Sequence, residues 1–286
     1  EAVITVSAHC QSHAGNVDVV IGTQPSGQGH ETSFAQVAAD WLGLRLDQVS
    51  IVMGDTDVVK HGGGSHSGRS MRMAGTVIVK SADELLKRGT ELVAFLMDIP
   101  ADEVTFSQGV FVAAGTNATL NLFEIASRLE DPAIQLALPT HLKGPLSVRC
   151  DNVMHTQVFP NGSQICEMEI DPATGAMAIV KYICVDDVGR AINPLIVEGQ
   201  THGGVVQGIG QALFEQCVID PHSGQPLSAT FMDYGFPRAD NFPFFVTELN
   251  ELPSPTNPLG IKAGGEGGTT GALATVVNAI VDALRP

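Results

Sequence analysis

The sequence has 286 residues, of which 31 are acidic and 15 basic, for a net charge of −16. Nucleic acids are bound by clustered Lys and Arg, and the densest basic segment here is only 69–72, so the charge balance argues against a polynucleotide partner. No apolar run approaches the roughly 20 residues of a membrane span.

The five cysteines are widely spaced and form no CxxC pair. This pattern favours reduced thiols in the cytoplasm and argues against a zinc or iron–sulfur site. At 44% hydrophobic content, the chain is long enough for one large core or two smaller domains.

The first half of the chain predicts strands and helices in alternation. Alternating β-branched residues indicate strands, and apolar residues at i, i+3, i+4 spacing indicate helices. Ser33 and Gln36 predict a capping box at the first helix. The expected elements are strands over 2–8, 17–23 and 49–53, helices over 34–42, 70–97 and 120–129, and a hairpin of 104–106 with 110–113.

The second half predicts three strands, a Gly-spotted helix, a turn-rich segment and a terminal helix. The apolar face of that last helix is expected to carry Leu273, Val276, Val277, Ile280, Val281 and Leu284. The expected elements are strands over 152–159, 163–170, 176–185 and 244–248, and helices over 194–215 and from about 270 onward. We expect an α+β fold of mixed or antiparallel sheets with packed helices, in two subdomains, 1–147 and 148–286.

Three Gly-rich loops lead into helices, over residues 24–32 (loop 1), 61–70 (loop 2) and 262–268 (loop 3). Glycine lets the backbone approach a ligand, and a helix start presents N–H groups to an anion. In loop 2, hydroxyl groups and Arg69 also suit a diphosphate. Ordinary solvated turns remain open as the alternative for loops 1 and 2.

Glu266 is the most distinctive residue of loop 3, since glycines occupy positions 264, 265, 267 and 268. A carboxylate with so little local cover is a candidate general base once a ligand encloses it. The alternative is a charge that complements the dipole of the following helix. Both interpretations stay open from the residues alone.

Two histidine pairs, His9 with His13 and His61 with His66, match neither HExxH nor a Cys/His finger. We therefore expect no metal site built from protein ligands. A metal-dependent hydrolase on these histidines is a much weaker hypothesis. Asp186-Asp187 is interpreted as a strand-end turn in preference to a cation site.

Six motifs, taken together and in order, resemble the xanthine dehydrogenase and aldehyde oxidase family of molybdenum hydroxylases. The resemblance is to the C-terminal half of the large subunit, its second molybdopterin-binding region, and covers nearly the whole chain. The motifs are GQGHET (27–32), GSHSGRS (64–70), VDDVGRAINP (185–194), EGQTHGGVVQG (198–208), NPLG (257–260), and GGEG (264–267) leading to VNA (277–279).

The resemblance implies a molybdopterin cytosine dinucleotide cofactor carrying molybdenum. Gln28, Gly29 and His30 would lie by the pterin and the molybdenum ligands, and Ser67, Gly68, Arg69 and Ser70 would hold the dinucleotide phosphates. Gln200 would contact the pterin or the nucleotide, and Lys262 and Gly265 would also bind cofactor. Glu266 matches the catalytic glutamate, which takes a proton from the attacking oxygen. We expect loops from both subdomains to surround this one anionic ligand.

The resemblance also implies partners and a reaction, the hydroxylation of an aldehyde, an N-heterocycle or CO with oxygen from water. The partners are the N-terminal half of the large subunit, an FAD-binding subunit and a [2Fe–2S] subunit. Two features depart from the family: loop 2 reads Ser67-Gly68 where the family has Gly-Ser, and the preceding half is absent from the sequence. We therefore expect this fragment to be inactive alone; a non-catalytic paralogue serving cofactor handling or assembly is the alternative.

Overall fold

The computed structural model describes residues 2–7, 15–59 and 61–285. The chain divides into two compact units, Glu1–Thr156 with Asn257–Leu259 (unit 1) and Gln157–Thr256 with Gly260–Pro286 (unit 2). The expected α+β class, with mixed sheets and packed helices, is confirmed. The domain boundary expected near residue 148 stays a prediction.

The described part of unit 1 contains short strands and four α-helices. Its strands are β1 (Ala2–Ser7), β2 (Asn16–Ile21), β3 (Thr23–Gln24), β4 (Val49–Val52), β5 (Gly63–Gly64), β6 (Val104–Ser107), β7 (Val110–Ala113), β8 (Thr119–Asn121) and β9 (Ser147–Cys150). Its α-helices are α1 (His30–Leu42), α2 (Ser70–Met97), α3 (Leu122–Arg128) and α4 (Pro132–Ala137).

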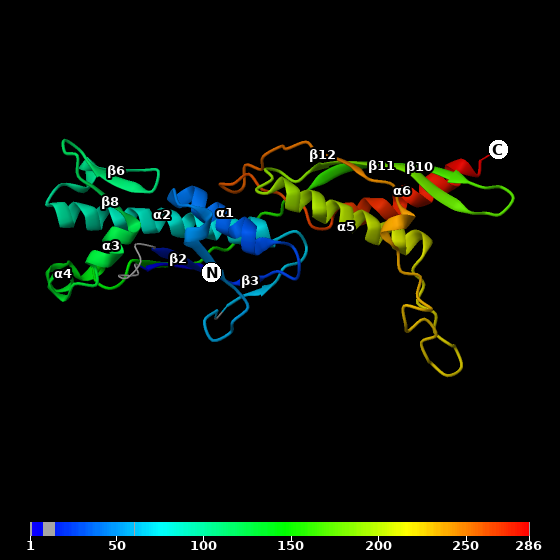
Figure 1. Ribbon diagram of the computed structural model, residues 1–286, viewed down its shortest axis with the longest axis horizontal. Helices are drawn as coiled ribbons and strands as arrows, with labels where there is room; N and C mark the ends of the chain where they lie inside the picture. Colours follow the sequence, from blue (N-terminus) through cyan, green and yellow to red (C-terminus); the bar gives the residue numbers. More distant parts are fainter. Residues whose placement is uncertain (1, 8–14, 60, 286) are drawn as a thin grey trace. The chain divides into compact units, whose positions relative to one another are not determined.

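The main sheet of unit 1 has the order β4-β2-β1-β9. Strand β1 is antiparallel to β2 and β9, whereas β4 is parallel to β2. Figure 1 shows α1 and α2 side by side, packed on this sheet. Alternate residues of β2 are buried, and the buried face of α2 packs on the neighbouring strands β1 and β9. Side-chain burial at ~1.5–3 kcal/mol per large residue favours this register.

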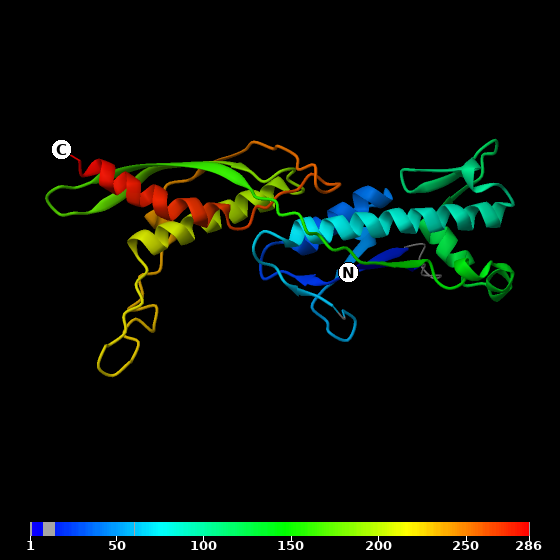
Figure 2. The ribbon, with the colours of Figure 1, turned by 180° about the vertical axis from the view of Figure 1, so that it is seen from behind.

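Unit 2 is built from a hairpin, a third strand and two long helices. Its elements are β10 (Asn161–Ile170), β11 (Met177–Asp187), β12 (Val246–Leu249), α5 (Pro194–Leu213) and α6 (Gly267–Ala283). Strands β10 and β11 are antiparallel, with an irregularity at Glu167/Met168, and β12 is parallel to β11. Figure 2 shows α6 lying along this hairpin and beside α5.

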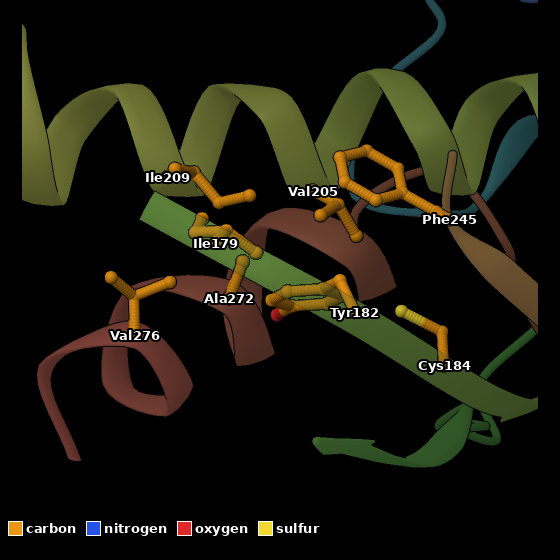
Figure 3. Close-up of a cluster of buried hydrophobic side chains, with 8 residues drawn as sticks. All are labelled: Ile179, Tyr182, Cys184, Val205, Ile209, Phe245, Ala272 and Val276. Atoms are coloured by element: carbon orange, nitrogen blue, oxygen red, sulfur yellow. The ribbon is translucent and has the colours of Figure 1, made fainter. Parts of the chain in front are cut away.

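The core of unit 2 lies where β11, α5 and α6 meet (Figure 3). Tyr182 is fully buried there, and its hydroxyl donates to Gln164 Oε1 at 2.7 Å. This hydrogen bond is needed because a buried hydroxyl without a partner is costly. The buried cluster comprises Ile179, Tyr182, Cys184, Val205, Ile209, Phe245, Ala272 and Val276.

Glycines allow the backbones of α5 and α6 to touch. A Cβ atom on Gly268 would lie 2.5 Å from Thr201 O, and one on Gly208 would lie 2.7 Å from Ala272 Cβ. No side chain fits between the helices at these points. The first turn of α6 is therefore held directly against α5.

The apolar face expected for α6 is wrong for four of its six residues. Leu273, Val277, Val281 and Leu284 are 38–65% exposed, whereas the buried positions are Gly268, Ala272 and Val276. The physical reason is the close helix crossing, which selects the small residues of α6 and turns the larger ones outward.

Other differences concern boundaries. The strand expected over 152–159 is wrong, since that segment forms no strand pairing and β9 lies just before it. Helix α1 begins at His30, with left-handed Gly29 as its N-cap and no side-chain cap, so the capping box of Ser33 with Gln36 is wrong. Residue 8 of the first expected strand lies outside the described residues.

Helices 194–215 and 70–97 and the 104–113 hairpin are confirmed in position. Helix α3 is shorter than the expected 120–129 because β8 takes its first residues; Asn121 caps it reciprocally with Glu124. Within residues 2–7, 15–59 and 61–285, no helix combines the length and apolar character needed for a bilayer crossing.

Candidate functional site

Loops 1 and 2 meet in unit 1 through the pairing of β3 with β5. The two strands are parallel, with Thr23 opposite Gly63. A Cβ atom on Gly62 would lie 2.1 Å from Gly22 O, and one on Gly22 would lie 2.3 Å from His61 O. Only glycine permits this approach, which brings the two loops predicted to bind cofactor together.

Polar side chains tie the two loops further. Gln28 Nε2 donates to Ser65 O at 3.2 Å, while Gln28 Oε1 accepts from Ser26 N at 2.6 Å. The hydroxyls of Thr23 and Ser65 lie 2.8 and 2.7 Å from Ser70 Oγ. Since Ser70 is buried, its hydroxyl helps to build the loops, and Gln28 is fixed by both its amide atoms.

The turn before α2 has two consecutive left-handed residues, Ser67 (φ 55°) and Gly68 (φ 60°). Glycine suits this conformation, whereas a non-glycine residue pays ~1–2 kcal/mol for it. Ser67 therefore carries backbone strain that a glycine at this position would not. Arg69 Nη2 donates to Gly64 O at 3.1 Å, and the guanidinium has further donors.

His30 lies at the first position of α1, half-buried and stacked on Phe34 with ring centroids 4.7 Å apart. Burial lowers the pKa of His30, although the nearby Glu31 carboxylate opposes this effect. His30 is thus held mainly neutral near pH 7, beside the backbone N–H groups of a helix start.

Loop 3 begins in unit 2 with an ion pair. Lys262 Nζ donates to Asp187 Oδ2, and both side chains are largely buried, with 14% and 7% exposed. Asp187 Oδ1 also accepts from the backbone N–H groups of Gly189 (2.9 Å) and Leu252 (3.2 Å). Burial raises the pKa of Asp187, but these hydrogen bonds and the Lys262 charge outweigh it, so the net pKa is below the usual value.

Glu266 occupies the N-cap position of α6 and is exposed. Its backbone carbonyl accepts from Thr270 N (3.1 Å) and Thr270 Oγ1 (2.9 Å), which closes the first turn of the helix. A Cβ atom on Gly265 or on Gly267 would meet nothing within 4 Å. The space beside the carboxylate therefore lets a ligand approach the backbone on both sides of it.

Gln200 lies on α5, one residue before Thr201, whose carbonyl meets Gly268 at the start of α6. Unit 2 thus brings together the segments carrying Gln200, Lys262, Gly265 and Glu266. Unit 1 separately brings together those carrying Gln28, Gly29, His30 and 67–70. The expectation that all these loops surround one ligand stays a prediction.

Asp186, next to Asp187, is a buried carboxyl. Burial raises its pKa, while the Thr201 hydroxyl, which donates to Asp186 Oδ2 at 3.3 Å, lowers it in part. The net pKa is above the usual value. The folded state therefore gains stability when this carboxyl is protonated, and loses it as the pH rises through the raised pKa.

Replacing Asp186 with Asn should consequently raise the melting temperature at pH 7, because the neutral amide carries no charge to desolvate and still accepts from Thr201. The gain should shrink as the pH falls through the raised pKa and vanish below ~3, where the carboxyl is protonated in both states. Thermal unfolding of parent and variant between pH 3 and 8 measures it. A difference that does not change with pH would contradict this explanation.

The histidine pairs do not assemble a metal site in the described part of the chain. His61 and His66 are exposed, and no group of three His, Cys, Asp or Glu residues there is placed to hold a metal ion. His9 and His13 lie outside the described residues.

The sequence profile of the molybdopterin cofactor-binding domain matches residues 4–243. The chain belongs to the molybdopterin cofactor-binding domains of the molybdenum hydroxylases. This domain is 34% identical to the 6-hydroxypseudooxynicotine dehydrogenase complex subunit gamma of Paenarthrobacter nicotinovorans, over 96% of the chain and 34% of that relative. It is 31% identical to the nicotine 6-hydroxylase large subunit of the same organism, over 95% of the chain and 33% of that relative.

Solved structures agree with this assignment. The domain matches quinoline 2-oxidoreductase from Pseudomonas putida 86 with a TM-score of 0.85 and 33% identity, over 99% of the chain and 35% of that structure. It matches the Cu,Mo-CO dehydrogenase with a TM-score of 0.86 and 29% identity, over 99% and 34%. The domain spans about a third of the length of these relatives.

The donors on the molybdopterin-binding domain suit an anionic pterin ligand. Gly27 and Gly64 are glycines on which a Cβ atom would meet nothing within 4 Å, so their backbones are open to a ligand. Arg69 and the N-terminal N–H groups of α1 supply donors without a large positive charge. Cofactor binding by loops 1 and 2 stays a prediction.

Three residues that hold loop 3 and the start of α6 are not indicated as such by the sequence: Asp187, Gln164 and Tyr182. For Asp187 the sequence predicts a strand-end turn, and the only signal is an acidic residue that ends an apolar strand. Gln164 Nε2 donates to the carbonyls of Gly267 (3.1 Å) and Gly268 (3.3 Å). Nothing in the local spacing connects Gln164 with residues about 100 positions later.

Proposed function

We propose that this chain is the part of a molybdenum hydroxylase large subunit that supplies the catalytic base and part of the cofactor-binding surface. The observation that carries the proposal is the placement of Glu266 at the exposed start of α6, with glycines on either side that open the backbone to a ligand. Because the chain belongs to the molybdopterin cofactor-binding domains, the ligand proposed beside this carboxylate is a molybdopterin cofactor.

In this proposal the Glu266 carboxylate takes the proton of a water-derived oxygen nucleophile as that oxygen attacks the electrophilic carbon of the substrate. The bound cofactor supplies a Lewis acid and accepts two electrons. Overall, R–H and water give R–OH, two protons and two electrons, and for CO the products are CO2, two protons and two electrons. The remaining protein groups bind and orient.

The cofactor we propose is molybdopterin cytosine dinucleotide. The phosphates would be bound by the turn of Ser67 to Ser70, where Arg69 is the cation and consecutive left-handed residues orient backbone N–H groups. Gln28, Gly29 and His30 would face the pterin, and Gln200 and Gly265 would complete the contacts. For Lys262 we propose support of the loop, since its ammonium group binds Asp187.

We propose three protein partners, namely the preceding part of the large subunit, an FAD-binding subunit and a [2Fe–2S] subunit that carry the electrons away. The names of the relatives as subunit gamma of a complex and as large subunits support this. The proposed substrates are aldehydes, N-heterocycles or CO, and the proposed compartment is the cytoplasm. The four described cysteines are free thiols.

The test is a composition and turnover measurement on the complete complex. We expect about one molybdenum per large subunit by elemental analysis, CMP on acid hydrolysis of the released cofactor, and dye reduction with one of the three substrate classes. The 286-residue chain alone serves as a control and should show no turnover.

Each deviation has a definite meaning. Molybdenum without turnover on any substrate would favour the non-catalytic paralogue. Stoichiometric zinc in place of molybdenum, with activity lost on replacing His61 or His66, would favour a hydrolase. Turnover by the chain alone would contradict the division of the site between this chain and the rest of the subunit.

A further inference from the structure

The β10–β11 hairpin contacts the Glu266 segment on both sides of the glutamate. The end of β11 binds Lys262, four residues before Glu266, through Asp187. The middle of β10 binds Gly267 and Gly268, the next two residues after Glu266, through Gln164. The two strands thus hold both ends of the segment 262–268, which contains four glycines.

The contact before Glu266 is the stronger of the two. Asp187 joins three segments, since it accepts from Lys262 Nζ and from the N–H groups of Gly189 and Leu252. Backbone hydrogen bonds join the same two segments: Lys262 N donates to Val188 O at 2.8 Å, and Arg190 N donates to Gly260 O at 3.0 Å. Largely buried charge-assisted hydrogen bonds of this kind resist displacement because each lost partner leaves an uncompensated charge.

The contact after Glu266 is a chain of hydrogen bonds between neutral groups. Tyr182, fully buried on β11 (Figure 3), donates to Gln164 Oε1 and so fixes which amide atom of Gln164 faces α6. The amide nitrogen then donates to two carbonyls in the first turn of the helix. A Cβ atom on Gly271 would lie 2.5 Å from the Gln164 side chain, so the amide is also confined sterically.

We infer that Asp187 and Gln164, assisted by Lys262 and Tyr182, are positioning residues that set where the Glu266 carboxylate stands relative to the reacting atoms. Glycines alone cannot hold this segment because they have the largest conformational freedom. The inference rests on the proposed function of Glu266, and it assigns Lys262 a role within the protein. Misplacement of a catalytic group by about 1 Å costs about 100-fold in rate.

The experiment uses Asp187→Asn in the complete complex, with kcat, KM, molybdenum content and thermal unfolding measured together. The amide keeps the size of the side chain but removes the charge that holds Lys262. We expect kcat to fall about 10- to 100-fold, KM to change less than about threefold, and molybdenum to stay at the parental level. The matched control is Asp171→Asn, the same change at an exposed carboxylate in the turn of the same hairpin, which should leave kcat unchanged.

Two further variants separate positioning from other roles. Lys262→Arg keeps the ion pair and should retain most of the parental kcat, whereas Lys262→Met should resemble Asp187→Asn. In the double variant Asp187→Asn with Lys262→Met, the losses should be far from additive, because either change alone already breaks the pair. The double variant also leaves no unpaired buried charge, so it provides a test if a single variant fails to fold.

Three results would overturn the inference: an unchanged kcat in Asp187→Asn, additive losses in the double variant, or a kcat loss that only follows a loss of molybdenum. Glu266→Gln is measured in the same series. If that variant is fully active, the proposed function itself fails. If it is inactive while Asp187→Asn is normal, only the positioning role fails.

Discussion

Glu266→Gln is expected to lower kcat/KM of the complete enzyme by about 10²- to 10⁴-fold, while its molybdenum content stays at the parental level. Glutamine keeps the shape of the side chain and its place at the start of α6, but it cannot accept the proton that the chemical step releases. The range is the usual contribution of a positioned general base. Steady-state kinetics with elemental analysis of the same preparation measures both quantities.

The control for this change is Glu169→Gln, at an exposed glutamate of β10 within the same unit. It carries the same loss of charge and should keep parental kinetics. The loss in Glu266→Gln should fall on kcat as well as on kcat/KM, because the interaction develops in the transition state. A near-parental rate in Glu266→Gln would remove the catalytic role assigned to this residue.

Gly268→Ala is expected to destabilise the protein by roughly 1–3 kcal/mol, as overpacking in a tight interior does. The added methyl group would lie 2.5 Å from Thr201 O and 2.8 Å from Val205 N. Both are backbone atoms of α5, so no side-chain rotation relieves the contact and the helices must separate. Denaturant unfolding of parent and variant gives the difference, and kcat should fall in parallel because Glu266 lies two residues away.

Gly203→Ala provides the matched control for helix packing. Gly203 lies on α5 but is exposed, and a Cβ atom there would meet nothing within 4 Å. This variant should be stabilised by about 0.5–1 kcal/mol, since alanine is the better helix former. Equal effects of the two substitutions would show that the close crossing of α5 and α6 is not what requires glycine at position 268.

The sequence predicts those elements whose burial pattern is local. Strand β2 alternates strictly, and the turn at 171–175 separates β10 from β11, so both were foreseen. The strand expected over 152–159 fails because strand formation needs a pairing partner, and no local pattern reveals whether one exists. The sequence predicts that the first helix begins near Ser33, but α1 begins at His30. Its N-cap is the left-handed Gly29, where a polar capping side chain was expected.

In the candidate site, too, the sequence predicts local features and misses contacts between distant segments. Glycines and the isolated Glu266 stand out in the sequence because their chemistry is unusual in its local context. The pairing of Lys262 with Asp187 spans 75 residues, and that of Gln164 with the first turn of α6 spans more than 100. Such contacts depend on how β11 and loop 3 pack, which residue spacing does not encode. The predicted buried face of α6 is wrong for a related reason. At the close crossing with α5 the small residues of α6 are buried, and its larger apolar residues face outward.

The direct contact of α5 with α6 has a mechanical consequence. Where long side chains interdigitate, a helix can slide by rotamer changes, but Gly268 meets main-chain atoms of α5 and Gly208 meets the short Ala272 side chain and main-chain atoms of α6. No long, flexible side chain separates α5 from α6 at these points. A displacement of one helix therefore has to move the other with it. We therefore expect a displacement at the Gln200 end of α5 to shift the start of α6, where Glu266 lies, together with it.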